Sequence, residues 1–158
     1  MKLLKILLLL IIPLGLYANE TIINGAFGVN FGQEFPDSDE VVVQFTPKFP
    51  ISAFDEYSVR LTPKSKRVYS IIANHKSNDS HSFDQRMQQC GRLLTLYRKK
   101  YTEPYSSLVS FSGVDDNFNT IQLDCFAEEL ILTSKEFLKI AEDERIEFLN
   151  KEFEKSGL

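Results

Sequence analysis

The sequence of 158 residues has no tryptophan, only two cysteines, two methionines and two histidines, and few glycines and prolines, seven and six. The low glycine and proline content excludes a fibrous or low-complexity polymer, and a hydrophobic content of 43% excludes a disordered chain. No apolar run reaches the roughly 20 residues that a membrane-spanning helix needs. Thirteen phenylalanines and six tyrosines can supply a core without tryptophan. The composition therefore predicts one ordinary globular domain.

The motifs of several enzyme classes are also missing. The chain contains no GxSxG elbow, HExxH helix or SxxK motif, and glycines 25, 28 and 32 fit neither the dinucleotide nor the P-loop spacing. We therefore expect no cofactor, no metal and a non-catalytic domain. An accessory cell-envelope hydrolase stays open as the alternative, because glycoside hydrolysis needs only two carboxylates at a suitable separation.

The first 18 residues have the layout of a secretory signal peptide. Lys2 and Lys5 accompany an apolar run over residues 3–12, and Ala18 offers a small residue for cleavage. Leu16 departs from the small residue preferred two positions before the cut, so an uncleaved N-terminal anchor, and with it membrane attachment, remains the alternative. We expect residues 19–158 to form a single exported domain, periplasmic or secreted.

Charge is unevenly distributed along the chain. Cleavage removes two lysines and no acid, so the formal net charge moves from −4 to −6, which argues against a general nucleic-acid binder. Residues 58–101 nevertheless hold ten Lys and Arg against Asp79 and Asp84, whereas residues 34–56 hold six acids against Lys48. Either the two regions neutralise each other and stay solvated, or the basic region contacts an anionic partner.

The basic region contains the candidate binding residues. They are expected to contact an acidic protein or an anionic envelope component, and no nucleic acid. The alternative is a solvated helix face. The candidates are Arg60, Lys64, Lys66, Arg67, Arg86, Arg92, Arg98, Lys99 and Lys100.

The two cysteines, Cys90 and Cys125, are expected to form a disulfide. Cys90 falls on an apolar stripe whose residues recur at spacings of three and four, as on the buried face of a helix. Cys125 alternates with Ile121 and Leu123, as on a strand that faces the same core. An even pair of cysteines in an exported domain favours a bridge, and neither a CxxC spacing nor a nearby histidine supports a metal site.

Hydrophobic periodicity predicts a single small α+β domain, mainly an antiparallel sheet packed by two long helices at about 82–102 and 134–156. Capping boxes are expected at Ser82 with Gln85 and at Thr133 with Glu136. The order strand, strand, helix occurs twice, which suggests a repeated unit. Residues 22–33 are expected to form a strand or a strand with a bulge. Further strands are expected at 41–45, 57–61, 68–73, 107–112, 120–126 and 129–132.

Two details of the helices carry further expectations. Gly91, inside the first helix, indicates a close approach to another backbone. The second helix carries Phe137, Leu138, Ala141, Ile146, Leu149 and Phe153, an apolar stripe expected to face the core.

Two polar loops carry weaker signals. His75, Asp79 and His81 lie in one loop and offer metal-ligating groups, but their spacing favours ordinary loop residues. The segment that starts at Asp115 begins like an EF-hand loop, but Thr120 replaces the required glycine. A turn is therefore expected there instead of a calcium site.

Overall fold

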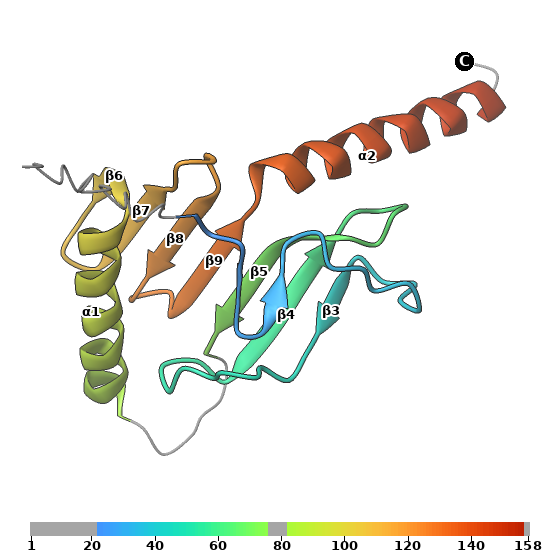
Figure 1. The fold of residues 1–158 in the computed structure, drawn as a ribbon. Helices are drawn as coiled ribbons and strands as arrows, with labels where there is room; N and C mark the ends of the chain where they lie inside the picture. Colours follow the sequence, from blue (N-terminus) through green and yellow to red (C-terminus); the bar gives the residue numbers. More distant parts are fainter. Residues whose placement is uncertain (1–21, 76–81, 157–158) are drawn as a thin grey trace, which may run out of the picture.

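The computed structural model describes residues 22–75 and 82–156, and within these ranges it contains nine strands and two helices (Figure 1). The predicted signal peptide, residues 1–18, lies outside the described residues. No helix in the two described ranges has the length and apolar character required to cross a membrane. The predicted α+β class is confirmed, as is the mainly antiparallel sheet with two long helices.

Seven strands form one antiparallel sheet in the order β3-β4-β5-β9-β8-β7-β6. The two strands β4 and β5 form a hairpin, and β5 lies inside the sheet, between β4 and β9. The strands span Val42–Gln44 (β3), Glu56–Leu61 (β4), Val68–Asn74 (β5), Thr102–Ser106 (β6), Ser110–Val114 (β7), Thr120–Asp124 (β8) and Glu129–Thr133 (β9).

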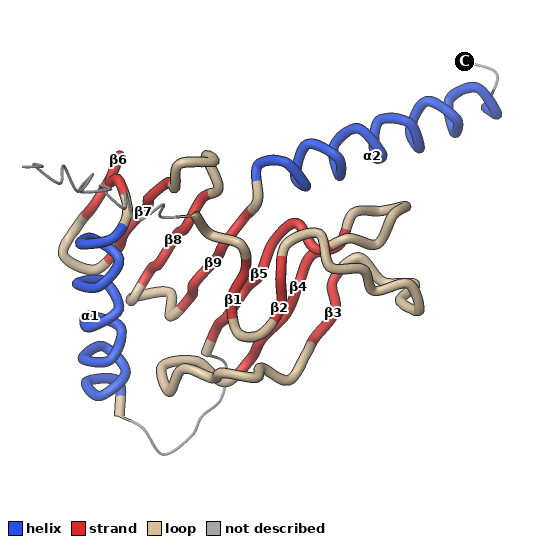
Figure 2. Tube along the Cα trace, viewed as in Figure 1, coloured by secondary structure: helices blue, strands red, loops and turns tan. Residues whose placement is uncertain are grey.

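One face of this sheet is apolar, because side chains alternate between the two faces along each strand. Val59, Ile71, Leu132 and Ile121 are cross-strand neighbours, and all four are buried. Helix α1, Phe83–Lys100, covers the β7 side of this face. The short hairpin of β1, Gly25–Ala26, and β2, Val29–Asn30, lies over the β4 and β5 side (Figure 2).

Helix α2, Lys135–Ser156, packs on the body of the protein only with its first half. Ala141 is buried, and the Phe137 ring lies where a Cβ on Gly32 would be, which explains the glycine there. From residue 145 to residue 156 every residue is exposed. The expectation that Ile146, Leu149 and Phe153 face the core is therefore wrong, because the sheet ends before this part of the helix begins (Figure 1).

Three local expectations also need correction. Residues 22–33 form a hairpin and not one strand, because Phe27 and Gly28 adopt positive φ and reverse the chain. The sequence did not indicate β6, where Pro104 interrupts the strand pattern. Thr133 ends β9, its hydroxyl donates to Ser70 Oγ, and it forms no capping box with Glu136.

The two strand-strand-helix segments occur in the expected order, β4-β5-α1 and β8-β9-α2, but their helices pack differently. Helix α1 lies on the apolar face near β7, whereas α2 contacts β5 and then extends past the sheet.

Candidate functional site

Helix α1 carries five of the nine predicted cationic site residues. Its N-terminus has the predicted capping box, in which Gln85 N donates to Ser82 Oγ and Ser82 N donates to the Gln85 side chain. Cys90 and Leu94 on the inward stripe are buried. Burial raises the pKa of Tyr97, on the same stripe, to about 12, so its hydroxyl stays protonated at neutral pH. The inward stripe thus fixes which residues of α1 face outward.

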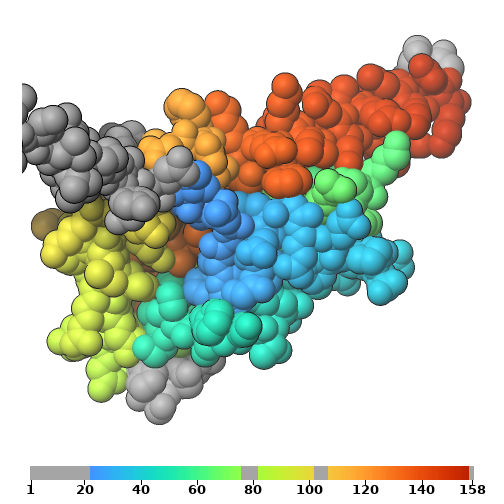
Figure 3. Space-filling model, in the orientation of Figure 1, coloured from blue at the N-terminus to red at the C-terminus, as the bar shows by residue number. Residues whose placement is uncertain are grey.

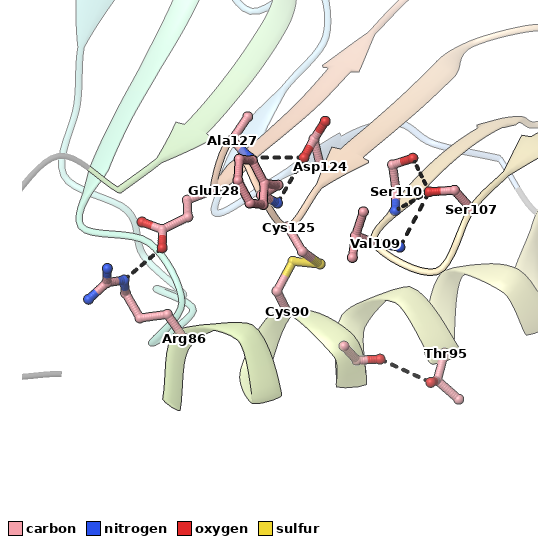
Figure 4. Close-up of a disulfide and its surroundings, with 12 residues drawn as sticks. Arg86, Cys90, Thr95, Ser107, Val109, Ser110, Asp124, Cys125, Ala127 and Glu128 are labelled. Carbon is pink, nitrogen blue, oxygen red and sulfur yellow. Dashed lines mark hydrogen bonds and ion pairs between the residues drawn. A yellow bond between two sulfur atoms is a disulfide. The ribbon is translucent and has the colours of Figure 1, made fainter. Parts of the chain in front are cut away.

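A disulfide joins α1 to the end of β8, as predicted. Cys90 and Cys125 are bonded with their Cα atoms 5.5 Å apart, and both side chains are buried (Figure 4). The bond fixes the helix on the sheet at its middle, so the outward face of α1 is held in one orientation.

The outward face of α1 is positively charged. Arg92, Lys99 and Lys100 are exposed, and they surround Leu96, whose exposed fraction is 61%. No ion pair of Arg92 or Lys99 occurs within the described residues, and Lys100 Nζ lies 5.1 Å from the centre of the Tyr101 ring. We call these four residues, Arg92, Leu96, Lys99 and Lys100, the α1 basic face. Sequence analysis did not include Leu96, although its position off the inward stripe indicates exposure.

Two other predicted residues of α1 point back to the protein instead. Arg86 Nε lies 2.8 Å from Glu128 Oε1, and both side chains are mostly buried (Figure 4). Arg98 donates hydrogen bonds from Nη2 to the carbonyl oxygens of Ser107 and Ser110. These two arginines attach α1 to the loops that flank β7 and β9, which gives them a structural role.

The remaining four candidates lie on the β4-β5 hairpin, near α2 and not near α1 (Figure 1). Arg67 forms an ion pair with Glu34 at 2.8 Å, and Lys64 lies 3.6 Å from Glu147. Lys66 Nζ donates to the carbonyl oxygen of Asp39 at 3.3 Å. Arg60 is exposed on β4. The nine predicted cations therefore form two separate groups, and the hairpin group is largely engaged with neighbouring acids and carbonyls.

The turn of this hairpin also receives a carboxylate from α2. Glu144 accepts hydrogen bonds from Lys64 N, Ser65 N and Ser65 Oγ. Burial alone would raise the pKa of Glu144, but these hydrogen bonds together lower it. The ionised Glu144 carboxylate thus stabilises the turn and holds α2 against the hairpin.

The two polar loops are structural where they are described. His75 Nδ1 lies 3.4 Å from Asp55 Oδ2, whereas Asp79 and His81 lie outside the described residues. Asp115 is buried and accepts hydrogen bonds from the backbone N of Ile23, at 2.6 Å, and of Asn119, at 2.8 Å. This carboxylate closes the β7-β8 turn, as expected, and attaches the N-terminal segment to it. Residues 22–75 and 82–156 contain no cluster of three or more His, Cys, Asp or Glu arranged to hold a metal.

A pair of carboxylates lies on the face of the sheet opposite α1. Asp124 and Glu129 are direct cross-strand partners, and they line an open hollow of about 270 Å³ with Ser110, Ser112 and Gln122. Asp124 Oδ1 accepts hydrogen bonds from the backbone N of Phe126 and Ala127, so this carboxylate closes the β8-β9 turn. The hydrolase alternative remains a prediction, with these two residues as the pair to test.

The α1 basic face thus combines three cations that form no ion pair within the described residues, an exposed leucine and a fixed helix. Comparison with models of protein families, with curated protein sequences and with solved structures finds no match to this chain, so its function is inferred from its own residues.

Proposed function

We propose that this chain is an exported, non-catalytic domain that binds an acidic protein through the α1 basic face. The observation that carries the proposal is the set of three exposed cations around an exposed leucine on a helix whose only acid is Asp84. Such cations lower the energy of an approaching acidic surface and increase the association rate.

The presence of Leu96 favours a protein partner over a simple anionic polymer. Protein interfaces combine an apolar centre with a polar rim, and Leu96 lies among Arg92, Lys99 and Lys100 in that way. The disulfide and the capping box hold the helix before the partner arrives, which reduces the entropy lost on binding.

Export is the second part of the proposal. The N-terminal pattern over residues 1–18 is that of a signal peptide, and a disulfide between the only two cysteines is stable in an oxidising compartment. Intact-mass measurement of the exported protein should find a chain that begins at Asn19. A chain that retains residues 1–18 and sediments with membranes would favour the anchor.

Charge reversal tests the binding site. The probe is poly-L-glutamate, a simple acidic polypeptide, whose affinity for the wild-type protein should fall as salt is added. In the test variant, Arg92→Glu, Lys99→Glu and Lys100→Glu are combined. Since an exposed charge pair contributes about 0.2–1 kcal/mol, loss of three pairs should weaken binding by about 0.6–3 kcal/mol, which is roughly threefold to 150-fold.

A matched control carries the same change of charge on the β4-β5 hairpin, with Arg60→Glu, Lys64→Glu and Arg67→Glu. Both variants have the same net charge, so a difference between their affinities reports the position of the site. The proposal expects the hairpin variant to bind clearly more tightly than the α1 variant, with both folded by circular dichroism. Equal affinities, or weaker binding by the hairpin variant, would contradict it.

A further inference from the structure

The second half of α2 exposes an apolar stripe. Ile146, Leu149 and Phe153 follow one another at spacings of three and four, so they lie on one side of the helix. Their exposed fractions are 56%, 45% and 57%. Phe148 is also exposed, but it lies outside this stripe. Large apolar side chains gathered on one surface mark an interaction site.

The position of α2 is set by its contacts up to Glu147, and the stripe stays exposed on its own chain. Glu144 accepts hydrogen bonds from the hairpin turn, and Glu147 is 3.6 Å from Lys64 Nζ. After Glu147 the helix continues alone for about two and a half turns, and the space-filling view shows it extending beyond the sheet (Figure 3). Within the described residues, Leu149 and Phe153 each keep about half of their surface exposed.

The first half of α2 borders an apolar groove. The groove has a volume of about 410 Å³, and its apolar lining includes Val41, Leu61, Pro63, Leu138 and Ala141. Glu142 and Arg145 form its charged rim on the helix side. Each chain thus carries both a projecting apolar stripe and a groove along one helix. A surface with both features can pair with its own copy about a two-fold axis.

An antiparallel pairing of two α2 helices matches these features in register. If Ile146 of one copy faces Leu149 of the other, then Phe153 faces Glu142 of the other copy, at the edge of the apolar groove. The same register places Arg145 beside Glu152 of the other copy, and the two-fold axis repeats this ion pair. Arg145 has no ion-pair partner among the described residues of its own chain, whereas Glu152 lies 2.9 Å from Lys155 Nζ on the exposed surface of its own helix and would exchange that contact for Arg145 of the other copy. A parallel pairing would instead place Arg145 beside Asn150, without an opposite charge.

We propose that the chain forms a symmetric dimer in which the α2 helices of two copies pack antiparallel through Ile146, Leu149 and Phe153. The ion pairs between Arg145 and Glu152 set the direction and register. The proposal is independent of the α1 basic face, which lies on the other helix.

Sedimentation equilibrium of the mature protein tests the dimer directly. The wild-type protein should show a reversible monomer-dimer equilibrium. Leu149→Glu and Phe153→Glu should each raise the dissociation constant at least about tenfold, because each buries a charge against apolar side chains. Phe148→Glu is the matched control, since Phe148 is at least as exposed as Leu149 and Phe153 but lies outside the stripe, and it should leave the equilibrium unchanged. All three positions are exposed in the single chain, so circular dichroism should show folded variants.

A charge swap tests the register. Arg145→Glu should weaken the dimer by repulsion from Glu152 of the other copy, and the double variant Arg145→Glu, Glu152→Arg should restore it. A wild-type protein that stays monomeric at its highest soluble concentration overturns the proposal, even if another protein covers the stripe. Failure of the double variant to restore a dimer that Arg145→Glu has weakened overturns the antiparallel register.

Discussion

Removal of the Cys90–Cys125 disulfide should lower the free energy of unfolding by an amount that depends on the length of the loop that the bond closes. The bond closes a loop of 35 residues. On the chain-entropy model, a loop of this length contributes about 3 to 4 kcal/mol by restricting the unfolded chain. For a domain of this size, that loss lowers the melting temperature by about 10 to 15 °C. The perturbation is the double variant Cys90→Ala, Cys125→Ala, and the assay is thermal unfolding followed by circular dichroism.

The same variant should loosen α1 more than the sheet. Cys90 and Leu94 are the only fully buried residues of the helix, whereas β5 is buried along most of its length. Amide hydrogen exchange in α1 should therefore accelerate before exchange in β4 and β5. Reduction of the wild-type protein is the control and should reproduce both effects. An unchanged melting temperature, or equal acceleration across helix and sheet, would refute the reasoning that the bond is what holds α1 in place.

Three further substitutions test individual contacts. Gly91→Ala should stabilise the protein by about 0.5 to 1 kcal/mol in urea unfolding, because a Cβ there meets no heavy atom within 4 Å and alanine favours the helix; a loss of stability would show that the glycine is needed. Asp115→Ala should cost about 3 kcal/mol, since buried backbone N–H groups lose their acceptor, and added calcium should leave the wild-type melting temperature unchanged. The pKa of Tyr97 is raised to about 12 by burial, so the folded protein binds this proton more tightly than the unfolded chain. This difference in pKa contributes stability that is fully present below pH 10 and is lost as the pH rises towards 12. The variant Tyr97→Phe should therefore lose less stability than the wild type over this pH range, as measured by urea unfolding.

Periodicity predicted the elements whose burial is visible in the local sequence. The inward stripe of α1 and the alternation of Ile121, Leu123 and Cys125 placed both cysteines on the core side, which is why the disulfide was predicted correctly. Periodicity did not indicate whether another element of the fold lies where it can pack against an apolar stripe. Leu149 and Phe153 have the spacing of core residues, yet they lie beyond the end of the sheet.

Charge in the sequence showed which residues are cationic but not which of them are already paired. Arg86 meets Glu128, 42 positions away, and Arg67 meets Glu34, 33 positions away, so only the fold brings these partners together. Gly91 is a similar case, because its expected close contact with another backbone is absent and the position is open space. Within the described residues, Arg92 and Lys99 of the α1 basic face form no ion pair, and Arg60 on β4 is likewise exposed without one.

Lysine footprinting tests the proposed function most directly. The mature protein is acetylated briefly with and without poly-L-glutamate at low salt, and modification at each lysine is measured by mass spectrometry. Binding through the α1 basic face predicts that Lys99 and Lys100 become protected, while Lys64 on the hairpin and Lys139 on α2 keep their reactivity. Protection of Lys64 with unchanged reactivity at Lys99 and Lys100 would contradict the assignment of the binding surface to α1.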